Sequence, residues 1–225
     1  KEYVSRGFPE QRVVVAPDAV DLARFAGLPD RKTARRSLGM PEEPKVICYT
    51  GHLYEWKGAH TLALASSYLP EGYLVYVVGG TSEDLEAYRG FLGAQGLERV
   101  RAVGHVPPNR VPAYLAAADA LALPNSGRSE TSSRHTSPMK LFEYMAAGRP
   151  IVASRLPSLL EVLRDGENAL LVKPDDPEAL AKGLVRAVTD RDLASRIAEV
   201  AREEVAAYSW DARAKTILTH LEKAS

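Results

Sequence analysis

The chain has 225 residues, and its 29 basic and 29 acidic side chains leave no net charge at neutral pH. A balanced charge argues against a nucleic-acid-binding protein, which usually carries an excess of Lys and Arg. Hydrophobic residues make up 45% of the chain, a normal share for a globular core, and no apolar run is long enough to span a bilayer. The single cysteine, Cys48, excludes a disulfide within the chain and suits a reducing compartment such as the cytoplasm.

Short apolar runs alternate with amphipathic segments along the whole chain. The predicted strands occupy residues 13–16, 46–50, 74–78, 100–103, 120–123, 151–153 and 169–172. The predicted helices occupy residues 31–38, 59–67, 82–94, 109–117, 138–147, 158–163, 177–189 and 192–207, and a last helix ends near residue 222. Continuous apolar strands that alternate with helices are typical of a parallel sheet covered on both faces. We therefore predict a Rossmann-like, doubly wound α/β fold.

Glycines and polar residues follow several of the predicted strands. Ligands of such sheets bind beyond the carboxyl ends of the strands, so these residues indicate a binding crevice at one edge. They are Gly51-His52, Gly79-Gly80, Gly104-His105 and Asn125-Ser126-Gly127.

The segment 136–154 contains its own helix signals. Ser137 is the predicted N-cap, Pro138 the first helical residue, and Gly148 the left-handed stop. The helix follows a long polar loop, residues 125–136, and the free N–H groups at a helix start are a natural phosphate site. Glu143 lies two turns into this helix, away from its apolar stripe, where a carboxylate can hold a ribose diol.

This segment, Thr-Ser-Pro-Met-Lys-Leu-Phe-Glu-Tyr-Met-Ala-Ala-Gly-Arg-Pro-Ile-Val-Ala-Ser, closely resembles a signature of retaining GT-B glycosyltransferases. Residues 13–21 resemble the opening of that family's C-terminal domain, residues 51–58 its first phosphate-binding loop, and residues 165–172 a late strand. The resemblance runs from about Val13 to the C-terminus in family order. It implies the C-terminal half of a GT-B fold, in a protein that transfers a hexose from a UDP- or GDP-sugar to an acceptor hydroxyl with retention.

The resemblance also implies a phosphate site without a bound metal or other cofactor. Gly51 and Lys57 would lie against the diphosphate, where the lysine can neutralise the leaving group. His52 stands where the family usually carries arginine, and a histidine is only partly charged near neutral pH. The backbone of Thr136, Ser137 and Met139 would cradle the phosphate, since Pro138 has no N–H to donate.

Three further roles follow from the resemblance. Glu143 matches the glutamate that the family uses for the ribose, and His105 and Val106 lie where the family lodges the base. Many members place a second glutamate around the donor sugar, with seven residues between the two, and His135 occupies that position here. Either His135 contacts the sugar, or Glu130 does, or this subgroup handles its sugar differently.

We expect three regions in the chain. Residues 1–11 form the remnant of an interdomain connection, residues 12–207 the nucleotide-sugar-binding domain, and residues 208–225 a helix that packs on an N-terminal, acceptor-binding domain absent from this chain. The expected partners are thus a nucleotide sugar and that domain, with no nucleic acid. The intact enzyme would be cytoplasmic, with peripheral membrane association left open. Two alternatives remain: a nucleotide-sugar epimerase or hydrolase of the same architecture, and a nonenzymatic nucleotide-binding module.

Overall fold

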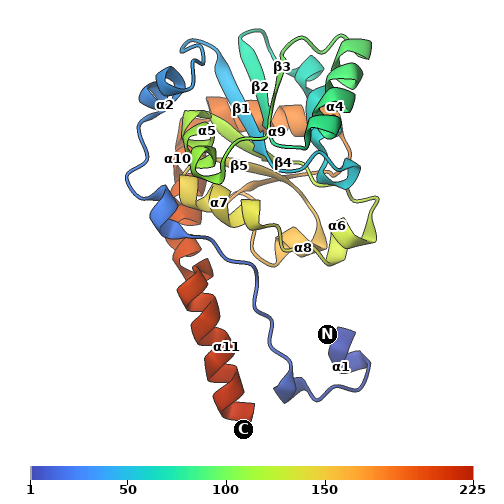
Figure 1. Ribbon diagram of the computed structural model, residues 1–225, viewed down its shortest axis with the longest axis vertical. Coiled ribbons are helices and arrows are strands. Elements are labelled where there is room, and N and C mark those ends of the chain that lie inside the picture. Colours follow the sequence, from blue (N-terminus) through green and yellow to red (C-terminus); the bar gives the residue numbers. More distant parts are fainter. Residues whose placement is uncertain (1, 225) are drawn as a thin grey trace.

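The computed structural model describes residues 2–224 and confirms the doubly wound α/β fold (Figure 1). Six parallel strands form one sheet in the order β3-β2-β1-β4-β5-β6. This order is that of the Rossmann fold. Ligands of that fold bind where the order of strand addition reverses, which is here between β1 and β4. The strands are β1 (Lys45–Thr50), β2 (Tyr73–Val78), β3 (Val100–Gly104), β4 (Ala120–Leu123), β5 (Ile151–Ser154) and β6 (Leu170–Val172).

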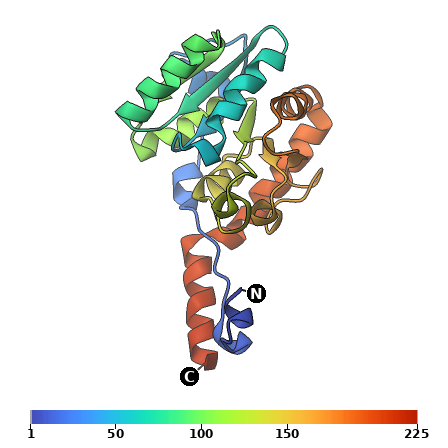
Figure 2. The same cartoon turned by 90° about the vertical axis from the view of Figure 1, so that its right-hand side faces the viewer.

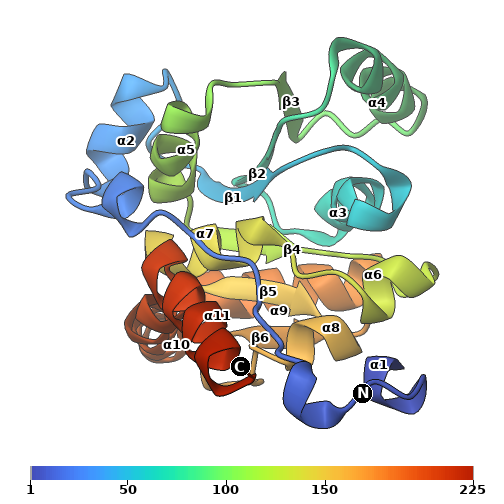
Figure 3. The same ribbon diagram turned by 60° about the horizontal axis from the view of Figure 1, so that its bottom comes forward.

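Helices cover both faces of the sheet. Figure 3 shows α2 and α5 on one side of β1 and β2, and α3 and α4 on the other. The longer helices lie within a few residues of the predicted ranges. The helices are α1 (Glu2–Ser5), α2 (Arg31–Ser37), α3 (Ala59–Ala65), α4 (Ser82–Ala94), α5 (Val111–Ala117), α6 (Glu130–Arg134), α7 (Met139–Ala147), α8 (Pro157–Leu160), α9 (Pro177–Thr189), α10 (Arg191–Glu204) and α11 (Trp210–Ala224).

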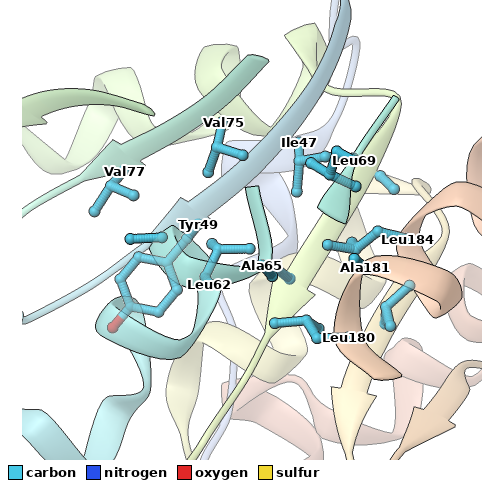
Figure 4. Packing of buried hydrophobic residues seen from close by; sticks show 14 of the residues in the cluster. Ile47, Tyr49, Leu62, Ala65, Leu69, Val75, Val77, Leu180, Ala181 and Leu184 are labelled. Carbon is cyan, nitrogen blue, oxygen red and sulfur yellow. The ribbon is translucent and has the colours of Figure 1, made fainter. Parts of the chain in front are cut away.

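Successive side chains along a strand point to opposite faces of the sheet, so the strands contribute to two main hydrophobic cores. Ile47 and Tyr49 of β1 pack with α3 and α9 on one face, as Figure 4 shows, together with Val75 of β2. Cys48, between them in the sequence, belongs to the other core with α7. Because both faces are buried, the central strands are apolar throughout, which is why the sequence pattern identifies them.

Two predictions for the elements were wrong. The apolar run 13–16 is not a strand: it lies outside the six-stranded sheet, and Val15 stays 71% exposed. The region predicted as a polar loop, 125–136, contains α6, whose first turn is capped by the Ser129 hydroxyl accepting from the Ser132 N–H (3.4 Å).

The two ends of the described chain lie together, away from the sheet (Figures 1 and 2). α11 projects from the body and the N-terminal segment runs beside it. Arg213 of α11 donates to the Pro17 carbonyl and to the Asp18 carboxylate, both at 2.9 Å. The Ser209 hydroxyl accepts from the Ala212 N–H at 3.1 Å and so caps the start of α11. None of the helices between residues 2 and 224 has the length and apolar character needed to cross a membrane.

Candidate functional site

Three glycines form the carboxyl edge of β1, β2 and β3. The Gly51 N–H donates to the Val78 carbonyl (2.9 Å), and the Gly79 N–H donates to the Gly104 carbonyl (2.7 Å). Gly79 has a φ of +124°, and a Cβ there would lie 2.2 Å from the Gly51 carbonyl oxygen. Only glycine permits this approach, so the backbone at the sheet edge is tightly joined and carries no side chains that would keep a ligand away.

The loop after β1 holds Lys57 at this edge. It includes the 3₁₀ turn Glu55–Lys57 and ends at Gly58, whose φ is +77°. The Lys57 ammonium lies 3.9 Å from the centre of the Trp56 ring, and burial lowers the pKa of the lysine. His52, at the start of the loop, is exposed, and its ring stacks on Tyr54 with 5.0 Å between ring centres.

The start of α7 is built differently from the sequence prediction. Pro138 is the N-cap, with extended backbone (ψ 116°), and no side chain caps the helix. Ser137 lies outside the helix, where its hydroxyl accepts from the Asp18 N–H (3.0 Å), so the predicted serine cap was wrong. Among residues 2–224 no hydrogen-bond acceptor takes up the backbone N–H groups of Met139 and Lys140. The helix therefore presents free donors, and its dipole favours an anion there.

Glu143 lies on α7, mostly buried, and pairs with Arg24. The Arg24 Nη1 stands 3.3 Å from the Glu143 Oε1, and the same guanidinium donates to the Pro108 carbonyl in the loop after β3. Burial raises the pKa of Glu143, and the positive charge of Arg24 opposes that rise. The pair thus links α7 to the loop that carries His105 and Val106.

The remaining predicted residues stand around this edge. His105 is exposed, and Val106 is partly buried against the core that contains Cys48 and α7. His135 is exposed at the end of α6, and the Thr136 hydroxyl donates to the Thr131 carbonyl (2.7 Å), which ties the segment before α7 to α6. Within residues 2–224 no three His, Cys, Asp or Glu side chains come together as a metal site would require.

Sequence reasoning missed two charged residues of the site. Lys140 is buried next to Tyr49, and its amine has no hydrogen-bond partner. In the sequence, Lys140 stands between Met139 and the apolar residues Leu141 and Phe142, and nothing in that pattern indicates its burial. Arg24 comes from the 3₁₀ turn Leu22–Phe25, far from α7 in the sequence, so no local pattern pairs it with Glu143.

The loops around the sheet edge also form a hollow in the surface. Its lining includes Trp56, His60, Arg128 and Asp175, from the loops after β1, β4 and β6 and from α3. It contains none of the predicted nucleotide-binding residues. The candidate site is accordingly defined by the sheet edge, Lys57 and the start of α7, and not by this hollow.

A doubly wound parallel sheet with a glycine edge and a helix start free of partners defines a Rossmann-like domain. The chain belongs to the family of glycosyl transferases group 1, whose family model matches residues 30–204. It is 32% identical over 219 residues to a D-inositol 3-phosphate glycosyltransferase of Corynebacterium urealyticum, a match that covers 92% of this chain and 50% of that protein. A protein of the same description from Nocardioides sp. is 32% identical over 225 residues, with 92% and 47% covered. The chain spans about half the length of the curated relatives it matches.

Solved structures show the same fold. HepE from Anabaena, crystallised with UDP and glucose, superposes with a TM-score of 0.81 at 22% identity, over 98% of this chain and 59% of that one. The C-terminal domain of LpcC, a glycosyl transferase group 1 family protein from Francisella tularensis, superposes with a TM-score of 0.66 at 19% identity, over 85% of this chain and 99% of that domain. The fold is therefore that of the C-terminal domain of GT-B glycosyltransferases, as the sequence predicted.

Proposed function

We propose that this chain binds the donor of a glycosyltransferase, a UDP- or GDP-hexose, whose sugar passes to an acceptor hydroxyl with retention. The observation that carries the proposal is that three features lie at the same edge of the sheet. Lys57 supplies a partly buried cation, α7 supplies backbone donors that have no acceptor, and Glu143 supplies a carboxylate four residues further along the helix. The structure of HepE with UDP and glucose supports a uridine nucleotide as the first to test.

Each part of the donor has a proposed place. The diphosphate lies against Gly51, Lys57 and the backbone from Thr136 to Met139, and these groups stabilise the charge that builds on it as the sugar leaves. The ribose diol binds Glu143. The base lies near His105 and Val106, and the sugar faces His135 or Glu130, with His52 at the mouth of the loop. The residues that we assign carry the charge without a bound metal.

The intact enzyme that we propose has a second domain. The curated relatives are about twice as long as this chain, which supports an acceptor-binding domain in addition to this one. A transferase of this kind serves the assembly of a polysaccharide or glycolipid. Acceptors of such enzymes are often at a membrane, so peripheral membrane association of the intact enzyme is part of the proposal.

Calorimetric titration of the chain with UDP, GDP and ADP tests donor binding. We expect one of the three to bind, and K57A to weaken it. We expect Glu143→Gln to weaken it by about 1.5–3 kcal/mol, the usual range for a hydrogen bond to a charged group. A 2′,3′-dideoxy nucleotide should bind wild type and E143Q equally. Absence of binding by all three nucleotides at millimolar concentration contradicts the proposal, and an E143Q variant that still prefers the full ribose removes Glu143 from it.

A further inference from the structure

Lys140 carries a buried amine that has no hydrogen-bond or ion-pair partner among residues 2–224. Its side chain is 8% exposed, and no hydrogen bond or ion pair within residues 2–224 reaches its Nζ atom. Placing an ammonium group away from water is costly unless another group compensates it. A helix that needed only packing at this position would carry an apolar residue, as α7 does at Leu141 and Phe142.

The Lys140 amine lies at the candidate phosphate site. Nζ is 4.0 Å from the centre of the Tyr49 ring, and a Cβ on Gly51 would stand 3.7 Å from it. The amine is thus close to Gly51, the first glycine of the proposed phosphate loop. Lys140 also stands in the first turn of α7, where the backbone N–H groups of Met139 and of Lys140 itself have no acceptor.

The charges around the amine are unbalanced. Burial lowers the pKa of Lys140 well below its usual range, and the positive charge of Lys57 lowers it further. None of the carboxylates between residues 2 and 224 pairs with either lysine, and Glu143, on the same helix, is paired with Arg24. Two neighbouring lysine amines without an anionic partner, beside free helix N–H groups, fit a ligand with more than one negative charge, because such a ligand favours the protonated form of both amines.

We propose that Lys140 is a direct ligand of the donor diphosphate and acts with Lys57. This inference rests on the proposed function. His52 stays a proposed neighbour of the diphosphate, with its ring exposed and stacked on Tyr54. The absence of a side chain at Gly51 leaves room for the lysine amine to reach a phosphate oxygen that approaches the sheet edge.

The test compares a nucleoside diphosphate with its nucleoside. The 225-residue chain is titrated with UDP and with uridine, and with the GDP or ADP pair if one of those binds the wild type better. Lys140→Met removes the amine and keeps an unbranched side chain that reaches as far as Cε. Lys45→Met is the matched control, because Lys45 is exposed at the opposite end of β1 and the variant loses the same charge.

We expect K140M to weaken diphosphate binding at least tenfold, K45M to leave it within twofold, and uridine to bind all three proteins alike. A K140M variant that binds the diphosphate like the wild type overturns the inference, while the proposed function stands if K57A still weakens it. A wild type that binds no nucleotide refutes the proposed function itself. Circular dichroism checks folding, and if K140M does not fold, Lys140→Gln takes its place with the same two outcomes.

Discussion

At the scale of single residues, the charge of Glu143 depends on Arg24. The folded chain holds the pKa of Glu143 above its usual value of 4.5 because the carboxyl is buried, and Arg24 limits that rise. Between 4.5 and the raised value the folded state binds more protons than the unfolded state does. The contribution of this group to stability therefore falls as the pH rises through that window.

Removing Arg24 should increase the loss of folding stability that accompanies ionisation of Glu143. We expect Arg24→Met to lower the free energy of unfolding by about 1–2 kcal/mol at pH 7, because a mostly buried carboxylate then lacks its partner. The loss should shrink near pH 4, where the carboxyl is protonated, and in the double variant with Glu143→Gln. Urea unfolding at both pH values measures it, with Arg110→Met, an exposed arginine of the turn before α5, as the control. Equal losses at both pH values would show that the ion pair is not the cause.

Residues of the site differ in how far the sequence could reveal them. Lys57 and Glu143 stand in local patterns, a glycine-flanked loop after a strand and a helix after a polar loop, so their positions at the edge follow from the alternation of strands and helices. The burial of Lys140 depends on Tyr49 and Gly51, which are about ninety positions away, and its lost solvation is a property of the folded core. No periodicity in the sequence carries that information.

At the scale of elements, too, local sequence patterns predict some features, and contacts between distant residues decide the others. The central strands and the long helices were predicted because each is apolar on the faces that it buries. The run 13–16 looks like a strand but lies outside the sheet, and the Ser137 hydroxyl looks like a cap but accepts from the N–H of Asp18, 119 positions earlier. Such errors arise because strand pairing and competing hydrogen bonds are decided by the tertiary fold.

Gly58 shows how strictly the fold fixes the conformation of the loop 51–58, the proposed phosphate loop. Its φ of +77° suits glycine, and a Cβ would lie 1.8 Å from the Pro124 carbonyl oxygen at the end of β4. We expect Gly58→Ala to destabilise the chain by at least about 2 kcal/mol and to abolish nucleotide binding, since the loop must move away from β4. Gly90→Ala is the contrasting control, because its site in α4 is open, and it should stabilise the chain by about 0.5–1 kcal/mol. Thermal unfolding of both variants measures this, and equal midpoints would contradict the assigned loop geometry.

At the scale of the whole molecule, α11 and the N-terminal segment leave the body together (Figure 2). Trp210 and Leu218 of α11 are 47% and 59% exposed, although both are large apolar side chains. A helix with exposed apolar residues at this place fits the proposal that a second domain packs on it. The proposed donor site, by contrast, uses residues of the sheet edge and of α7.

Donor binding and sugar transfer should therefore separate in this chain. Transfer with retention needs donor and acceptor held together across a cleft, and positioning supplies a large part of the rate. We expect the 225-residue chain to bind the nucleotide but to transfer no radiolabelled hexose. Transfer should appear when an N-terminal domain of about 100–200 residues is joined to it. Transfer by the chain alone, at the rate of the longer protein, would place the acceptor site within residues 125–136. Release of free sugar or of an epimer without an acceptor would instead favour a hydrolase or an epimerase.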